Sequence, residues 1–118
     1  MAEARQVPYQ AGDVLLADLD PVAGHEQGGR RPVLVLSGPS YNELRNEQLI
    51  VAAITSRQRS LPFHIPLGAD SGLSAPSWVQ SETIRAISAR RVISHLGRAH
   101  PQTVTEVRNR VINFLRDW

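Results

Sequence analysis

The chain has 118 residues, which suits one folded domain and leaves no room for a second. Hydrophobic residues make up 42% of it and charged residues 20%, with a formal net charge of +2, which is ordinary for a soluble globular protein. No apolar run approaches the roughly 20 residues of a transmembrane helix, and the lack of cysteine excludes disulfides and thiolate metal sites.

Short apolar segments bounded by turn residues predict strands along most of the chain. The segment 62–67 is expected at a sheet edge because two prolines interrupt it. Between the first two strands, residues 21–31 hold three glycines and mostly polar side chains, which predicts a loop. In chain order the predicted strands are 14–19, 32–36, 49–54, 62–67, 77–80 and 83–87, with 91–94 as a candidate seventh.

Two segments carry helix signals. Ser40 with Glu43 has capping-box spacing and predicts a short helix to about residue 46. Thr103 with Glu106 makes a second capping box, and apolar residues then recur at helical spacing to the end of the chain. These apolar positions are Val104, Val107, Val111, Leu115 and Trp118.

Several short strands with one packed helix predict a small, curled, mostly antiparallel sheet that resembles a compact barrel. We expect residues 1–118 to form a single domain in which residues 1–11 are a flexible or edge N-terminus. The first ten residues lack the basic-then-apolar layout of a signal peptide. Together with the lack of cysteine, this favours a cytoplasmic protein.

All thirteen basic residues are arginine. The guanidinium fork matches phosphate oxygens, so such a surface suits a polyanion. A coding bias toward G and C would also favour arginine over lysine, and a net charge of +2 is too small to indicate nucleic-acid binding by itself. Any such site must therefore come from local clustering.

The sequence holds no recognisable metal, nucleotide or serine-hydrolase motif. Its four histidines are scattered, the glycine-rich string 24–31 lacks the ending of a P-loop, and no serine nucleophile elbow occurs. Polar side chains instead gather in three patches, 24–31, 55–57 and 80–82. These patches are either solvated turns or functional loops held by a rigid scaffold.

Three blocks of the sequence resemble the MazF/PemK/Kid toxins, in the order in which that family carries them. The resemblance implies an SH3-like barrel of the MazF/CcdB type that works as a homodimer. It also implies a toxin of a type II toxin–antitoxin system that cleaves single-stranded RNA, chiefly messenger RNA, and is inhibited by an antitoxin with an acidic, disordered tail. The blocks are 12–21 with 24–29 and 31–35, then 51–56, and then 72–73 through 84–87.

RNA carries its own nucleophile, the 2′-hydroxyl next to the scissile phosphate. An enzyme has to deprotonate it, stabilise the crowded phosphorus and protonate the departing 5′-oxygen, which leaves a 2′,3′-cyclic phosphate and a 5′-hydroxyl. Positioned cations and hydrogen-bond donors can hold the developing charge, so no metal or other cofactor is expected.

The resemblance assigns the catalytic work first to Arg31 and Thr55. Arg31 matches the family's active-site arginine before Pro-Val-Leu, and its fork can grip two phosphate oxygens. Thr55 matches the catalytic-site threonine at the end of a strand, where its hydroxyl could donate to the phosphate or orient the nucleophile. Ser56 is a weaker companion.

Glu82 and His25 match the acidic residue and the loop histidine of the Kid branch, where they are candidates for acid–base work. A carboxylate partly buried between apolar strands suits proton transfer, and imidazole titrates near neutrality. The Kid branch has an arginine where this chain has Gln80, which favours a mechanism centred on Arg31 and Thr55.

Further side chains are expected to contact RNA. Glu26 and Gln27 would read bases or order their loop, while arginines near the candidate site, Arg59 among them, would follow the phosphates. Trp78 is interpreted as core or dimer seam, and the remaining histidines as structural or exposed. The expected RNA contacts are Glu26, Gln27, Arg30, Ser56, Arg57, Gln80 and Arg85.

Two other functions fit the same fold. A CcdB-like toxin poisons DNA gyrase by binding, without cleaving anything. A plain SH3-like module would bind peptide or nucleic acid, although such modules usually display an aromatic groove, and aromatic residues are only 5% of this chain.

Overall fold

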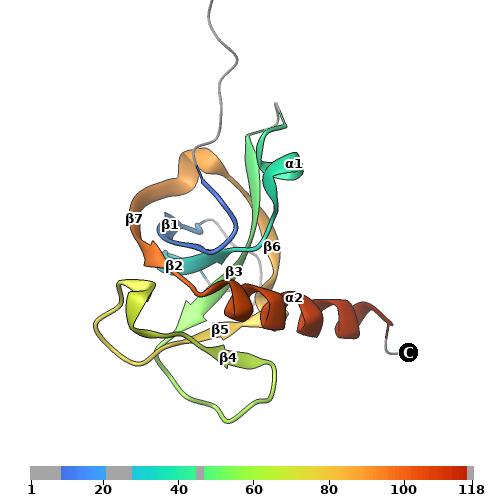
Figure 1. Ribbon diagram of the computed structural model, residues 1–118. Helices are drawn as coiled ribbons and strands as arrows, with labels where there is room; N and C mark the ends of the chain where they lie inside the picture. Colours follow the sequence, from blue (N-terminus) through green and yellow to red (C-terminus); the bar gives the residue numbers. More distant parts are fainter. Residues whose placement is uncertain (1–8, 21–27, 45–46, 117–118) are drawn as a thin grey trace, which may run out of the picture.

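The computed structural model describes residues 9–20, 28–44 and 47–116. They form strands, two α-helices and three short 3₁₀ turns, shown in Figure 1. The strands are β1 (Asp13–Asp18), β2 (Arg30–Val35), β3 (Gln48–Thr55), β4 (His64–Pro66), β5 (Trp78–Gln80), β6 (Arg85–Ser88) and β7 (Val92–Arg98); the helices are α1 (Pro39–Asn42) and α2 (Pro101–Arg116); the 3₁₀ turns are η1 (Ala69–Ser71), η2 (Ser81–Thr83) and η3 (Ala89–Arg91).

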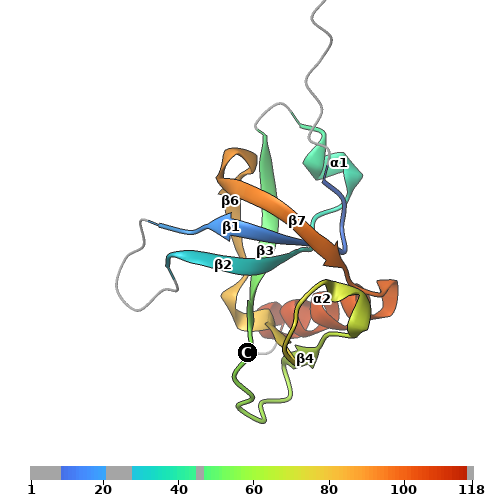
Figure 2. The ribbon, with the colours of Figure 1, turned by 90° about the vertical axis from the view of Figure 1, so that its left-hand side faces the viewer.

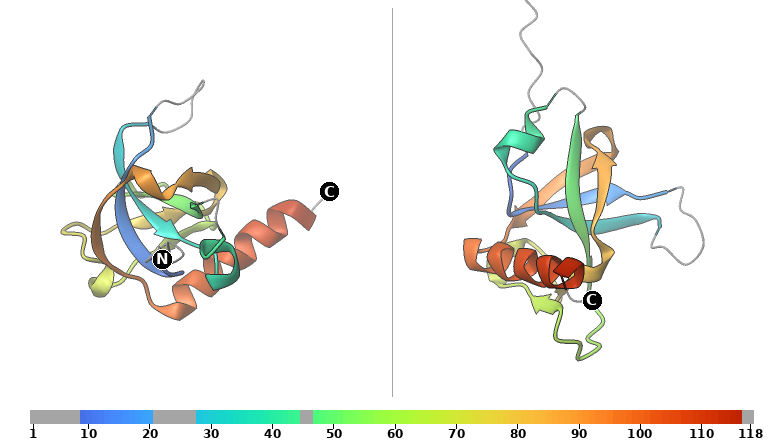
Figure 3. Two further views of the ribbon diagram at one scale, coloured as in Figure 1. Left: turned by 90° about the horizontal axis from the view of Figure 1, so that it is seen from above. Right: turned by 90° about the vertical axis from the view of Figure 1, so that its right-hand side faces the viewer.

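All neighbouring strands pair antiparallel, in the order β4-β5-β3-β2-β1-β7, and β6 pairs separately with β3. The mostly β fold with a short internal helix and a C-terminal helix is therefore confirmed. The candidate strand at 91–94 is real and extends to Arg98. Within the predicted segment 62–67 only residues 64–66 form a strand, β4, and it lies at the sheet edge, as predicted. The sheet is strongly curled (Figure 3), but within the described residues no ladder joins β7 to β4 to close a barrel.

The long strand β3 organises the sheet by changing partners along its length. One edge pairs with β2 over residues 51–53. The opposite edge pairs with β6 over residues 48–51 and then with β5 over residues 54–55. Before its short ladder with β3, the first residues of β2 pair with β1 alone, and in Figure 2 this part of β1 and β2 points away from the end of β3.

Apolar side chains are buried on both faces of β1, β2 and β3, which explains why these strands read as continuous rather than alternating apolar runs. Successive side chains of a strand point to opposite faces of the sheet, so the buried side chains belong to two separate core clusters. One cluster lies under α2 and includes Val14, Leu34, Ala52, Ile54, Val79, Val104 and Val107. The other includes Leu15, Val33, Val35, Val51 and Ile87.

Both predicted capping boxes are wrong, because each helix begins at a proline that precedes the predicted cap. α1 begins at Pro39 behind Gly38, with no side-chain cap. α2 begins at Pro101, two residues before Thr103, and the ring Nδ1 of His100 accepts a hydrogen bond from the Gln102 N–H at 3.0 Å. Proline suits the first helical position because its φ is already helical and the N–H it lacks would have no intrahelical partner there.

The apolar stripe of α2 is buried only over its first half. Val104 and Val107 are in the core, whereas Ile112 is 45% exposed and Leu115 is 78% exposed. The predicted stripe position Trp118 lies outside the described residues. Among the described residues, no helix is long and apolar enough to span a membrane.

Candidate active site

A groove of about 410 Å³, here called the polar groove, lies where β2 begins and β3 ends. Its third side is the segment 73–77, here called the wall segment, which leads from η1 into β5. The polar side chains that line it are arginine, serine and threonine. The lining residues are Arg30, Arg31, Pro32, Ile54, Thr55, Ser56, Leu73, Ser74, Ala75 and Ser77.

The register of β2 and β3 brings Arg31 and Thr55 together. The ladder ends at the pair Val33–Ala53, and two further residues along each antiparallel strand lead to Arg31 and Thr55. Beyond that pair the two strands no longer pair with each other, while β2 stays paired with β1 and β3 pairs with β5 on their other edges. The polar groove lies in the gap between the two strands. Arg31 lines it from β2 and Thr55 lines it from β3.

Both of these residues are half-buried, on strands that fix their backbones. The Thr55 Oγ1 accepts a hydrogen bond from the Arg57 N–H at 3.1 Å, and this fixes the oxygen while the hydroxyl proton can still be donated. Arg30 and Ser56, the neighbours of the two residues, are exposed and line the same groove. The arrangement can therefore hold a phosphodiester between cationic and hydroxyl donors.

The wall segment was not predicted as part of a site. Its start is fixed by a close backbone crossing of η1 over β7 that only glycine allows. A Cβ on Gly72, where φ is +80°, would lie 1.8 Å from the carbonyl oxygen of Leu96, and a Cβ on Gly97 would lie 2.4 Å from the carbonyl oxygen of Ser71. The glycines at positions 72 and 97 are the sequence signals that could have pointed to this crossing.

Glu82 does not lie between apolar strands, so that expectation is wrong. It is on η2 with its side chain 39% exposed, and its carboxylate pairs with the Nε2 of the buried His64 at 2.8 Å. Gln80 is buried at the end of β5. Neither Glu82 nor Gln80 is among the residues that line the polar groove.

The other predicted site residues fall into two groups. Arg57 is exposed directly after β3, and Arg85 is half-buried on β6 opposite Val51, outside the groove lining. His25, Glu26 and Gln27 lie outside the described residues. Within the described part of the chain, no three His, Asp or Glu side chains are grouped so as to hold a metal ion.

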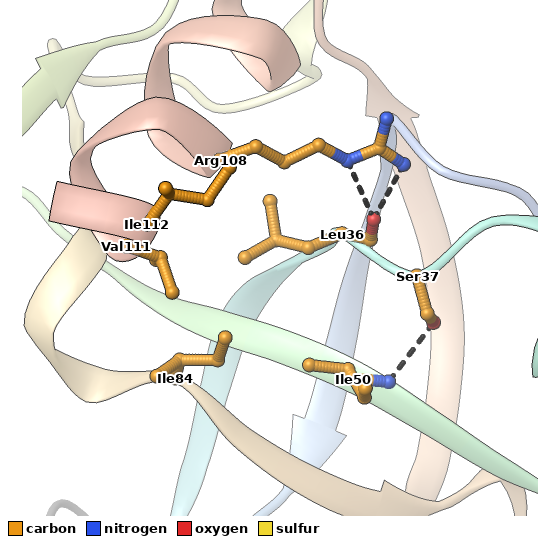
Figure 4. Close-up of a pocket in the computed structure, with 7 residues that line it drawn as sticks. All are labelled: Leu36, Ser37, Ile50, Ile84, Arg108, Val111 and Ile112. Carbon is orange, nitrogen blue, oxygen red and sulfur yellow. Dashed lines mark hydrogen bonds between the residues drawn. The ribbon is translucent and has the colours of Figure 1, made fainter. Parts of the chain in front are cut away.

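A second groove, about 240 Å³ in volume, lies between α2 and β3 and is mainly aliphatic (Figure 4). We call it the apolar groove. The guanidinium of Arg108 closes one end by donating two hydrogen bonds to the carbonyl oxygen of Leu36, at 2.9 and 2.6 Å. Its lining residues are Leu36, Ser37, Ile50, Ile84, Arg108, Val111 and Ile112.

A family model described as the PemK-like, MazF-like toxin of type II toxin–antitoxin systems matches residues 10–115. The chain belongs to this family, and the resemblance drawn from its sequence blocks is confirmed.

Named relatives agree with this assignment. The chain is 43% identical over 91 residues to endoribonuclease EndoA of Bacillus subtilis, covering 72% of this chain and 78% of that protein. It is 36% identical over 103 residues to endoribonuclease MazF of Staphylococcus saprophyticus, covering 85% of each.

Solved structures of the family have the same fold. MazF of Deinococcus radiodurans superposes with a TM-score of 0.81 at 35% identity, covering 92% of this chain and 96% of that one. A MazE-MazF structure from the same organism gives a TM-score of 0.76 at 34% identity and covers 97% of this chain and all of the other.

Proposed function

We propose that this chain is the toxin of a type II toxin–antitoxin pair and an endoribonuclease that cleaves single-stranded RNA, chiefly messenger RNA, at selected sequences. The observation that carries the proposal is the convergence of Arg31 and Thr55 on one groove of about 410 Å³. Two relatives that are 43% and 36% identical to the chain are endoribonucleases by name, which supports it.

In the proposed reaction the ribose 2′-oxygen loses its proton and attacks the adjacent phosphorus. The bond from phosphorus to the 5′-oxygen breaks, and that oxygen takes up a proton. The products are a 2′,3′-cyclic phosphate and a 5′-hydroxyl. Arg31 holds two phosphate oxygens through its planar fork and stabilises the charge that builds up on them. Thr55 donates its hydroxyl to the phosphate or orients the attacking oxygen.

The general base and acid are proposed by resemblance. Glu82, whose carboxylate is partly exposed, is a candidate base, and His25 is the second acid–base candidate. Arg30 and Ser56 extend the polar groove along the backbone of the substrate. The remaining RNA contacts proposed are Glu26, Gln27, Arg57 and Arg85. Gln80 is buried, so it is not retained as a direct RNA contact.

We further propose a homodimer that acts in the cytoplasm and is inhibited by a cognate antitoxin. Structures named as MazE-MazF and as an endoribonuclease with its cognate antitoxin exist for relatives, which supports an antitoxin partner. Two exposed apolar side chains of the apolar groove, Ile84 and Ile112, and the exposed Leu115 further along α2 support self-association through the face that carries α2.

The alternative of a gyrase-poisoning toxin gains no support, because the named relatives are endoribonucleases. A binding module without activity would not need Arg31 and Thr55 to share one groove.

The test is to incubate the purified protein with a long, mixed-sequence RNA in the presence of EDTA and to map the cut ends. We expect a small set of sites that share a sequence, with cyclic phosphate and 5′-hydroxyl termini. Intact RNA, or 5′-phosphate termini, would contradict the proposal. A supercoiling assay with gyrase, run in parallel, examines the alternative directly.

A further inference from the structure

The hydroxyl of Thr83 is built into the sheet at the point where β3 changes partners. The Ala53 N–H donates to Thr83 Oγ1 at 2.7 Å, and Thr83 Oγ1 donates to the carbonyl oxygen of Gln80, also at 2.7 Å. A side-chain hydroxyl thus uses both its acceptor and its donor capacity to bridge two backbone groups.

The register shows what this bridge replaces. β3 pairs with β5 at Ile54–Val79 and Thr55–Trp78, so the next pair along the ladder would join Ala53 to Gln80. In place of a direct N–H to carbonyl bond, the Thr83 hydroxyl lies between them. The inserted hydroxyl is therefore a third rung in a ladder that otherwise has only two residue pairs.

These two pairs and this rung hold the end of β3 against β5, and Thr55 is the last residue of that strand. β2 has already separated from β3 at Thr55, because its ladder ends at Ala53. Within the described residues the strand pairing of Thr55 is therefore to β5 on one edge, and that edge begins at the rung made by Thr83.

We infer that Thr83 is a positioning residue, which acts through Thr55 by fixing the end of β3 at the polar groove. Thr83 is not among the residues that line the groove, so its proposed effect on the reaction is indirect. Without the hydroxyl, the Ala53 N–H and the Gln80 carbonyl, which belong to buried residues, lose these two hydrogen bonds. The strands then either close directly or separate, and both responses move Thr55 relative to Arg31.

This inference rests on the proposed function, and Thr83→Val tests it because valine keeps the shape of threonine but has no hydroxyl. A displacement of about 1 Å at a reacting group can cost about 100-fold in rate. We expect kcat for a short RNA substrate to fall by about 10- to 100-fold, with KM within about twofold of wild type. Thr83→Ser, which restores the hydroxyl, should return kcat to within about threefold.

The matched control is Thr105→Val, the same change at an exposed position of α2, which should leave kcat unchanged. All variants are assayed well below their melting temperatures, so that a loss of stability alone does not lower kcat. If Thr83→Val does not fold, Thr83→Ala replaces it under the same criteria.

A folded Thr83→Val or Thr83→Ala variant with kcat within threefold of wild type would overturn the inference. So would an equal loss in Thr83→Ser. Thr55→Val separates this failure from failure of the proposed function. If Thr55→Val cleaves normally, the proposed role of Thr55 is wrong. If it is inactive while Thr83→Val is normal, only the role of Thr83 is wrong.

Discussion

Arg31 and Thr55 lie opposite each other in the register of β2 and β3, each two residues beyond the last paired residues, Val33 and Ala53. Each is held by a different outer partner, since Arg31 pairs with Ala17 of β1 and Thr55 with Trp78 of β5. β2 and β3 thus separate at the position where Arg31 and Thr55 lie opposite each other. A phosphodiester placed in that opening meets a guanidinium from one strand and a hydroxyl from the next.

Arg31→Ala should abolish cleavage while leaving the fold intact, because Arg31 is only half-buried at the start of its strand. Removing a donor that stabilises transition-state charge typically costs about 100- to 1000-fold in kcat. The measurement is cleavage of a fluorogenic RNA, with circular dichroism as the check on folding. Arg90→Ala is the matched control, because its side chain is 81% exposed on η3. An active Arg31→Ala variant would refute the proposed role.

A substrate with deoxyribose at the single nucleotide 5′ to the scissile phosphate should resist cleavage, because the attacking oxygen is then missing. The same oligonucleotide with deoxyribose one position further along should be cut at the normal rate. Gel analysis of both, at equal concentrations, measures the effect. Equal cleavage of the two would mean that the enzyme activates water instead of the sugar hydroxyl.

Glu82→Gln tests the general base. A base acts in its deprotonated form, so the rate falls along the acid limb of the pH–rate profile as the base takes up a proton. Glutamine cannot titrate, and we expect this limb of the kcat/KM profile to flatten while kcat falls. His64→Gln is a companion variant, because His64 pairs with this carboxylate at 2.8 Å. An unchanged acid limb in Glu82→Gln would place the base elsewhere.

The strands were largely predictable from sequence because their signals are local. β1, β2 and β3 are continuous apolar runs, and burial on both faces produces such runs. The helix starts were not predictable from the capping boxes alone. The helices begin at Pro39 and Pro101, before the predicted caps Ser40 and Thr103, because proline suits the first helical position.

The family resemblance singled out two residues, Arg31 and Thr55, that the structure places in one groove. The register of β2 and β3 explains why they lie together. The location of Glu82 was predicted wrongly because Glu82 lies on the turn η2. This turn is held by a hydrogen bond between Thr83 and Ala53, which lies thirty residues earlier in the chain. The wall segment depends on the approach of Gly72 to the backbone of Leu96, a contact between distant residues that no local pattern contains.

Gly72→Ala should destabilise the protein and weaken the groove wall. Alanine at φ +80° is strained, and its Cβ would lie 1.8 Å from the carbonyl oxygen of Leu96, so the backbone of η1 or β7 must move. We expect a loss of about 2 kcal/mol or more in the free energy of unfolding, which lowers the melting temperature by roughly 8 °C. Gly68→Ala is the control, because nothing lies within 4 Å of its added Cβ. Equal melting temperatures for the two variants would contradict the account of the wall.

Ile112→Glu tests whether the face that carries α2 joins two copies of the chain. Ile112 is 45% exposed beside the apolar groove, and a carboxylate there would have to be desolvated in an interface, which is costly without a partner. We expect the variant to elute as a monomer in size-exclusion chromatography with light scattering, while wild type elutes as a dimer. Ile93→Glu is the matched control, since Ile93 on β7 is also 45% exposed, and it should stay dimeric. If Ile93→Glu separates the copies and Ile112→Glu does not, the dimer uses the β7 face instead, and the apolar groove needs another occupant.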